Sequence, residues 1–117
     1  MRILLLEDNP EAQDAIFAML EALGHQVAAE GDGAAGLLRL SQGFDLVITD
    51  IMMPVMDGIS FLVEARKLRP EIPVVAMTAR RDSNYLRTAE LLGASATLYK
   101  PFSLAQLAAA VEAGKGA

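Results

Sequence analysis

The chain contains no cysteine and no tryptophan, and only 5% of its residues are aromatic. Without cysteine it can form no disulfide, no thiolate nucleophile and no cysteine-ligated metal site. It also has no apolar stretch near the roughly 20 residues that span a bilayer. The N-terminus turns at once into an acidic segment, which does not fit a signal peptide. We therefore expect a cytoplasmic domain that does not contact a membrane.

Basic residues are also few, since 10 Lys and Arg stand against 15 Asp and Glu, for a formal net charge of −5. Proteins that bind nucleic acid or anionic lipid usually carry a basic surface, so we expect this chain to bind neither nucleic acid nor a lipid surface directly. The 117 residues, 53% of them hydrophobic, suit one domain with a real core of aliphatic side chains. We treat residues 1–117 as a single domain.

Short apolar runs alternate along the chain with longer helical patterns. The predicted strands are Arg2–Leu6, Gln26–Ala29, Leu46–Thr49, Val74–Met77 and Ala96–Tyr99. The predicted helices are Pro10–Leu23, Ala34–Gln42, Ile59–Leu68, Ser83–Leu92 and Leu104–Ala113. Because the strands are near-continuously apolar, both of their faces should be buried. Five βα repeats predict an α/β, flavodoxin-like, doubly wound parallel sheet in the order 2-1-3-4-5.

Turn and cap residues mark the ends of these elements. The start signals are Asn9-Pro10, Asp57-Gly58, Asp82-Ser83 and Ser103, and left-handed ends are expected at Gly24, Gly43 and Gly93. The segment Glu30–Gly33 reads as a solvated turn, and residues 114–117 as a frayed end or the start of a linker. His25, the only histidine, reads as a surface loop residue.

Three of the predicted strands end at charged residues. Glu7-Asp8 follows the first strand, Asp50 the third, and Lys100 the fifth. In such sheets ligands bind beyond the carboxyl ends of the strands, where strands one and three lie side by side. Three clustered carboxylates repel one another, and Mg²⁺, which prefers oxygen ligands, would relieve that repulsion. The sequence therefore predicts a site for a divalent metal and a phosphoryl group; the plainer reading is a solvated acidic turn.

Individual roles follow from the same placement. A carboxylate such as Asp50 can accept a phosphoryl group covalently, although a turn residue would look the same. Thr78 ends the fourth strand and could donate to a phosphoryl oxygen, or be an ordinary strand threonine. Lys100, held extended by Pro101, should point along the sheet edge toward the acids. Met52 and its neighbours Met53 and Met56 read as packing residues.

Four segments in this order resemble the receiver domain of two-component response regulators over residues 1 to about 113. They are Leu6-Glu7-Asp8-Asn9, the stretch 45–58, the stretch 73–79, and Gly93-Ala94-Ser95 with Tyr99-Lys100-Pro101-Phe102. The resemblance implies that Asp50 accepts a phosphoryl group from a phosphohistidine on a sensor kinase or a phosphotransfer protein. The domain would catalyse this step on itself and then switch conformation to control a downstream effector domain or protein.

The same resemblance implies a role for each site residue. Asp8 and Asp50 would ligate Mg²⁺ directly, with the backbone carbonyl of Met52, and Glu7 would assist. Thr78 and Lys100 would bind phosphoryl oxygens, and the Lys100–Pro101 peptide bond would be cis. Phosphoryl transfer fits such a site because it needs mainly alignment and charge neutralisation.

The chain departs from the family pattern in places. Glu7 stands where aspartate is commoner, and Thr97 stands where an aromatic residue usually forms half of the switch, while Tyr99 adjoins the lysine. The resemblance also implies that the positions of Met52 and Arg80 tune attack by water on the phosphoaspartate. A bulky methionine with a long arginine there predicts slow autodephosphorylation.

Three other functions remain open at this stage. The first is a degenerate receiver that binds partners without phosphorylation, which Thr97 favours. An aspartyl-phosphate phosphatase would need an acid two residues after its nucleophile, where this chain has Met52. A flavin-binding domain is compatible with the fold, but the acidic loop after the first strand would repel a flavin phosphate.

Overall fold

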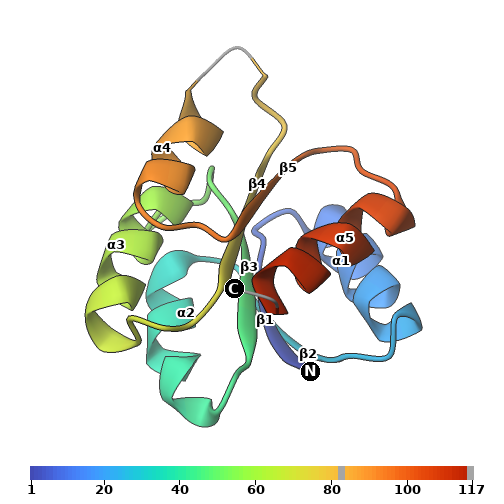
Figure 1. Cartoon of the computed structure of the whole chain (residues 1–117), viewed down its shortest axis with the longest axis horizontal. Coiled ribbons are helices and arrows are strands. Elements are labelled where there is room, and N and C mark those ends of the chain that lie inside the picture. The colour runs from blue at the N-terminus through green and yellow to red at the C-terminus, as the bar shows by residue number, and fades with distance from the viewer. Residues whose placement is uncertain (82–83, 116–117) are drawn as a thin grey trace.

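The computed structural model describes residues 1–81 and 84–115. One parallel sheet lies between two layers of helices, in the strand order β2-β1-β3-β4-β5 (Figure 1). The strands are β1 (Arg2–Leu6), β2 (Gln26–Glu30), β3 (Leu46–Asp50), β4 (Val74–Thr78) and β5 (Ala96–Tyr99). This architecture and strand order are the ones that the sequence predicts.

The helices cover both faces of the sheet. They are α1 (Pro10–Ala22), α2 (Gly33–Arg39), α3 (Gly58–Leu68), α4 (Tyr85–Leu91) and α5 (Leu104–Lys115), with a 3-10 turn η1 (Leu40–Gln42) after α2. Helices α1 and α5 lie on one face, and α2, α3 and α4 on the other (Figure 1). In the described part of the chain, no helix has the length and apolar character needed to cross a bilayer.

Two hydrophobic clusters fill the space between the sheet and its helices. Alternate residues of β1 point to opposite faces, so Leu4 and Leu6 join the cluster under α2, α3 and α4. Ile3 and Leu5 join the cluster under α1 and α5. The strands β1, β3 and β4 are buried almost throughout, as predicted for a doubly covered sheet. The prediction is wrong for β2 and β5, which are only partly buried because each has a neighbouring strand on one side only.

Most of the predicted helix boundaries are confirmed to within two residues, and their caps have physical causes. The side chains of Asn9 and Asp57 accept hydrogen bonds from amides in the first turns of α1 and α3. Ser103 and Gln106 cap the start of α5 reciprocally. The backbone amide of Gln106 donates to Ser103 Oγ over 3.0 Å, and the backbone amide of Ser103 donates to Gln106 Oε1. The chain turns through positive φ at Gly24, Gly43 and Gly93. The start signal at Asp82-Ser83 lies outside the described residues, and α4 begins at Tyr85.

Three predicted segments need correction. The single helix predicted over 34–42 is α2 followed by the 3-10 turn. The turn at 30–33 is not merely solvated, because its side chains make structural contacts. Asp32 caps α2, and Glu30 pairs with Arg39 over 3.0 Å. Gly114 and Lys115 continue α5 instead of fraying: Gly114 is buried, and a side chain there would collide with Leu46. Residues 116–117 lie outside the described residues.

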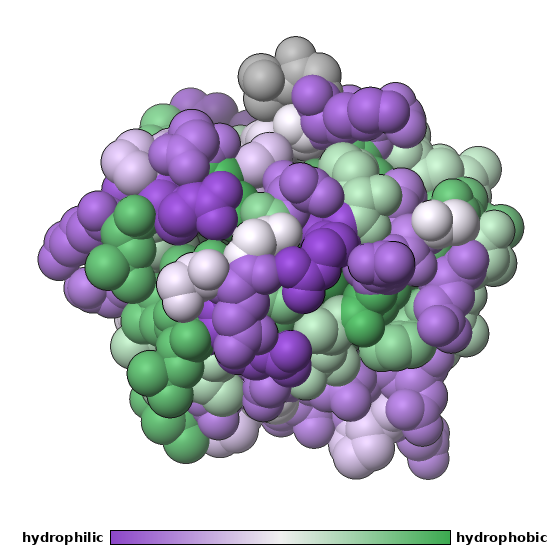
Figure 2. Space-filling view, turned by 90° about the horizontal axis from the view of Figure 1, so that it is seen from below, coloured by the Kyte–Doolittle hydropathy of each residue, from purple (hydrophilic) through white to green (hydrophobic). Residues whose placement is uncertain are grey.

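The exposed large apolar side chains are spread over several elements. Figure 2 shows the molecule from below the view of Figure 1, and hydrophobic surface gathers there on the side where α2 and α3 lie. Leu38 of α2 is 82% exposed and Leu68 of α3 is 62% exposed. These residues mark the helical layer opposite α1 and α5.

Candidate functional site

The carboxyl ends of β1, β3 and β5 bring the predicted acids and the predicted lysine together. Glu7 and Asp8 follow directly after β1, and Asp50 is the last residue of β3, which pairs with β1. One carboxylate oxygen from each of the three lies within 4.8 Å of the others. Glu7 and Asp50 are buried, whereas Asp8 is exposed to solvent. The cluster therefore has a buried floor and an open side.

Lys100 closes this cluster from β5, two strands away from β3. Its ammonium nitrogen lies 2.6 Å from Glu7 Oε1 and 2.6 Å from Asp50 Oδ2, so it bridges the two buried carboxylates. The Lys100–Pro101 peptide bond is cis, as predicted. The site thus combines three carboxylates with one cation from the opposite end of the sequence.

Burial and ion pairing have opposite effects on the pKa values of Glu7 and Lys100. Burial raises the pKa of Glu7, and the hydrogen bond from Lys100 opposes part of that rise. Burial would lower the pKa of Lys100, but its hydrogen bonds to Asp50 and Glu7 outweigh burial and raise that pKa. The lysine therefore stays charged, while Glu7 takes up a proton more readily than an exposed glutamate.

Asp50 is held at the start of a tightly packed loop. Its Oδ1 accepts a hydrogen bond from the Met52 amide over 3.2 Å, which leaves Oδ2 for the lysine. The Gly58 amide donates to the Ile51 carbonyl over 2.8 Å and closes this loop onto α3. A Cβ at Gly58 would overlap the backbone carbonyl of Asp50, so only glycine lets α3 start this close to the acid.

The remaining predicted site residues lie around the cluster without entering it. The hydroxyl of buried Thr78 accepts a hydrogen bond from the Arg80 amide over 3.1 Å, and within the described ranges no hydrogen bond joins it to Asp50. Met53 and Met56 pack against the core, as the sequence predicts. The same prediction is wrong for Met52, which is 43% exposed.

Tyr99, Thr97 and His25 lie outside the acidic cluster. Tyr99 is 36% exposed, and the guanidinium of Arg81 lies 4.5 Å from the centre of its ring. Thr97 is half-buried in β5. His25 precedes β2 and its Nδ1 lies 3.2 Å from the N-terminal nitrogen, at the end of the sheet away from the acids. The Arg81–Tyr99 stack was not predicted, because it depends on the path of the loop after β4.

Sequence reasoning also missed Gln13. Its side-chain amide donates to the Glu7 carbonyl over 2.9 Å, from the first turns of α1. A glutamine on an amphipathic helix reads as solvated, so no local pattern marked it.

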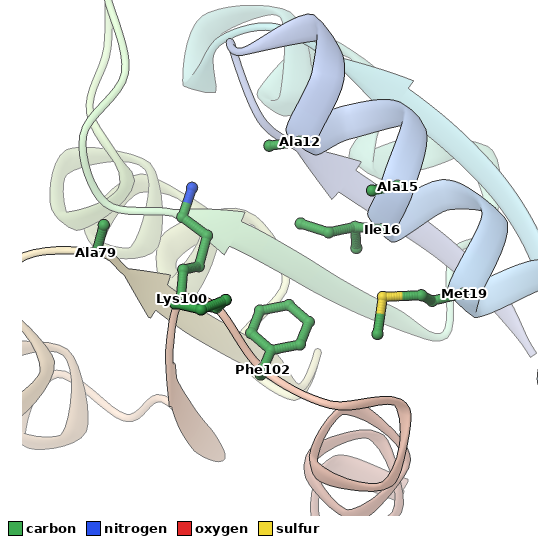
Figure 3. A pocket seen from close by; sticks show the side chains of 8 residues that line it. Ala12, Ala15, Ile16, Met19, Ala79, Lys100 and Phe102 are labelled. Carbon is green, nitrogen blue, oxygen red and sulfur yellow. The ribbon is translucent and has the colours of Figure 1, made fainter.

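A groove borders the cluster on the side of α1. It has a volume of about 320 Å³ and lies between α1 and the segment that follows β5 (Figure 3). Ile16 and Met19 line one wall, and Phe102 and Lys100 line the other. The lysine therefore has its stem in apolar surroundings and its ammonium among the acids.

The donor set suits a hard divalent cation. All three candidate ligands are carboxylates, and Mg²⁺ typically takes one or two of these together with water and phosphate oxygens. One ammonium among three carboxylates leaves the cluster with an excess of negative charge. The residues present therefore fit a divalent metal better than they fit an empty, solvated turn.

Comparisons with known proteins agree with this geometry. The family model described as the response regulator receiver domain matches residues 3–112. The chain is 42% identical over 115 residues to the transcriptional regulatory protein HprR of Escherichia coli, covering 97% of this chain and 51% of that protein. It is 35% identical to a probable chemotaxis protein CheY of Rhizobium etli, over 100% of this chain and 94% of that one.

A solved structure matches over nearly the whole chain. The receiver domain of the sensor histidine kinase PA1611 from Pseudomonas aeruginosa, solved with a magnesium ion in its active-site cleft, has a TM-score of 0.91 at 32% identity, covering 99% of this chain and 98% of that one. In contrast, this chain spans about half the length of several of the curated relatives it matches.

Proposed function

Since the chain belongs to the response regulator receiver domain family of two-component systems, we propose that it is phosphorylated on Asp50 and switches conformation in response. The observation that carries this proposal is the bridge that Lys100 makes between Glu7 and Asp50, with Asp8 beside them. A charge cluster of this kind, at the carboxyl edge of a parallel sheet, is suited to hold a phosphoryl group. We propose that residues 1–117 act as one receiver domain in the cytoplasm.

The proposed reaction is a transfer between two side chains. An oxygen of the Asp50 carboxylate attacks the phosphorus of a phosphohistidine, so that a P–O bond forms as the P–N bond breaks. Lys100, already 2.6 Å from Asp50 Oδ2, is placed to bind an oxygen of the incoming group. Thr78, from the neighbouring strand end, would bind another after leaving the Arg80 amide. Hydrolysis of the acyl phosphate restores the carboxylate and releases inorganic phosphate.

Mg²⁺ is the metal that these residues would hold, with Glu7, Asp8, Asp50 and the Met52 carbonyl as the proposed ligands. When bound, it would neutralise negative charge on the phosphoryl oxygens during transfer. The magnesium ion in the related receiver domain of PA1611 supports this choice.

Receiver domains interact with histidine kinases and with output domains, and we propose partners of these two kinds for this chain. The donor would be a sensor kinase or a phosphotransfer protein, and the recipient of the signal an effector domain or protein. The surface of α4, β5 and α5, which includes Tyr85, Arg87 and Tyr99, is the proposed output face. Exposed Met52 and Arg80 flank Asp50 and Thr78, and we propose that they slow hydrolysis of the phosphoaspartate.

Intact-mass spectrometry tests the proposal directly. After incubation with Mg²⁺ and acetyl phosphate, we expect the chain to gain one phosphoryl group, and Asp50→Asn to gain none. Asp14→Asn, on the exposed surface of α1, is the matched control and should be phosphorylated like the unaltered chain. An unchanged mass, also after incubation with phosphorylated donor proteins, would reject the proposal.

A degenerate receiver is the second candidate, because Thr97 replaces the usual switch aromatic. Such a domain would bind its partners without phosphorylation. Metal binding separates the two, since a ligand that binds only the folded state raises the unfolding temperature. Stabilisation by Mg²⁺ that Asp50→Asn abolishes would favour the phosphorylated switch, and no stabilisation would favour the degenerate receiver.

A further inference from the structure

Gln13 joins helix α1 to the ends of two strands. Its Nε2 donates to the backbone carbonyl of Glu7 over 2.9 Å and lies 3.5 Å from the carbonyl of Glu30, the last residue of β2. The side chain is half-buried, and its hydrogen bond to Glu7 crosses from a helix to a loop rather than along one element. The first contact is a normal hydrogen bond and the second a weaker one.

The Glu7 carbonyl belongs to the peptide plane that leads into Asp8. Because that plane is rigid, a donor that fixes the carbonyl also fixes the nitrogen of Asp8. The other contacts of Glu7 hold different atoms. Its backbone amide donates to the Glu30 carbonyl over 3.0 Å, and its Oε2 accepts from the backbone amide of Asn9 over 3.1 Å. Gln13 is therefore the side chain that sets the orientation of the plane between the two acids.

Asp8 depends on that orientation more than its neighbours do. Glu7 and Asp50 are buried and held by Lys100, but the exposed carboxylate of Asp8 makes no hydrogen bond or ion pair within the described residues. Its oxygen nevertheless lies within 4.8 Å of theirs. Only the backbone places it there, so a turn of the peptide plane would carry it away from the cluster.

We propose that Gln13 is a positioning residue for the acidic cluster, holding Asp8 in reach of a divalent cation through the carbonyl of Glu7. The proposal rests on the proposed function, because it assigns Gln13 to the same metal site. Residues that orient metal ligands from outside typically change affinity by 10- to 100-fold. Gln13 acts through the backbone, so we expect the low end of that range.

The test measures Mg²⁺ affinity and stability separately, in the 117-residue chain. Gln13→Met keeps the length of the side chain but removes the donor, and Gln13→Asn draws the donor back by one methylene. Gln42→Met is the control, because Gln42 accepts a hydrogen bond from Arg39 over 3.1 Å at the other end of the sheet. The Mg²⁺ dissociation constant comes from NMR titration of the Asp8 and Asp50 amides, and stability from urea unfolding without metal.

We expect both Gln13 variants to bind Mg²⁺ about tenfold more weakly, with a shifted Asp8 amide even before metal is added. Gln42→Met should bind Mg²⁺ like the unaltered chain, because its hydrogen bond with Arg39 lies far from the acids. A Gln13→Asn or Gln13→Met dissociation constant within about twofold of the unaltered value would overturn the positioning role while leaving the metal site standing. Equal weakening in Gln42→Met would also overturn it. An unaltered chain that does not respond to Mg²⁺ would overturn the proposed metal site and this inference together.

Discussion

Replacing Lys100 by methionine should destabilise the metal-free protein strongly. The ammonium touches both Glu7 and Asp50 at 2.6 Å, and the side chains of these two acids are only 1% and 7% exposed. Methionine keeps most of the apolar stem that lines the groove beside α1, so the main change is the loss of the charge. Two buried carboxylates would then face each other without a counter-charge.

The size of the effect follows from the geometry. The candidate ligand oxygens lie within 4.8 Å of one another, and two unit charges at that distance repel by about 3.5 kcal/mol at an effective dielectric of 20. Removal of one partner from a buried ion pair typically costs about 3–5 kcal/mol. Lys100 is 19% exposed, so solvent weakens its pairing, and Glu7 can take up a proton. We therefore expect Lys100→Met to lower the free energy of unfolding by about 3 kcal/mol at pH 7.

Urea unfolding without Mg²⁺, followed by circular dichroism, measures this loss. Lys67→Met is the matched control, because Lys67 pairs with Glu64 over 3.1 Å while 66% exposed. A surface pair of this kind contributes about 0.5 kcal/mol or less. Saturating Mg²⁺ should restore more stability to Lys100→Met than it adds to the unaltered chain, because the variant offers the metal an uncompensated cluster.

The loss should also depend on pH with a definite sign. Burial already raises the pKa of Glu7, and removal of the ammonium raises it further. The folded variant then binds a proton more tightly than the unfolded chain, so its stability increases as the pH falls. The difference from the unaltered chain should narrow between pH 7 and pH 5. If Lys100→Met unfolds like Lys67→Met at pH 7, or the difference widens at low pH, the reasoning is refuted.

Three further substitutions test other contacts. Gly58→Ala should cost about 2–3 kcal/mol in urea unfolding and weaken Mg²⁺ binding, because its Cβ would overlap the carbonyl of Asp50. Arg66→Met should cost about 1–3 kcal/mol in thermal unfolding, because it removes the hydrogen bonds that the guanidinium donates to the carbonyls of Gly93, over 2.8 Å, and Ile72. Burial, helped by the N-terminal charge, lowers the pKa of His25, so stability should fall as the pH drops below about 6.5, and His25→Asn should remove that dependence.

The convergence of the acids and the lysine was predictable because topology alone enforces it. Parallel strands joined by helices place all their carboxyl ends at one edge, so residues that end β1, β3 and β5 must meet there. The order of the strands places Asp50 beside Glu7 without any side-chain detail. Cap residues such as Asp57 were predictable for a different reason, because they act within a few residues of their own position.

Features that depend on how elements sit against each other were not predictable. The role of Gln13 depends on the rotation of α1 relative to β1, and a helix pattern does not give that angle. The continuation of α5 through Gly114 depends on contact with Leu46 of β3, where only a small residue fits. The Arg81 stack on Tyr99 requires the exact path of a loop. The partners of Gly114 and Arg81 are remote in the sequence, whereas Glu7 is near Gln13 but lies across the turn from β1 to α1.

Phosphorylation would change the charge balance that holds this site together. Three carboxylates and one ammonium leave two negative charges, which one divalent cation would balance. A phosphoryl group brings about 1.5 to 2 negative charges to Asp50 in place of the single charge of its carboxylate. Lys100 now divides its contacts between Glu7 and Asp50 Oδ2, and that oxygen would compete with new phosphoryl oxygens of higher charge. Tyr99 directly precedes the lysine and stacks under Arg81, so a shift that includes the backbone of Lys100 would move a residue of the proposed output face.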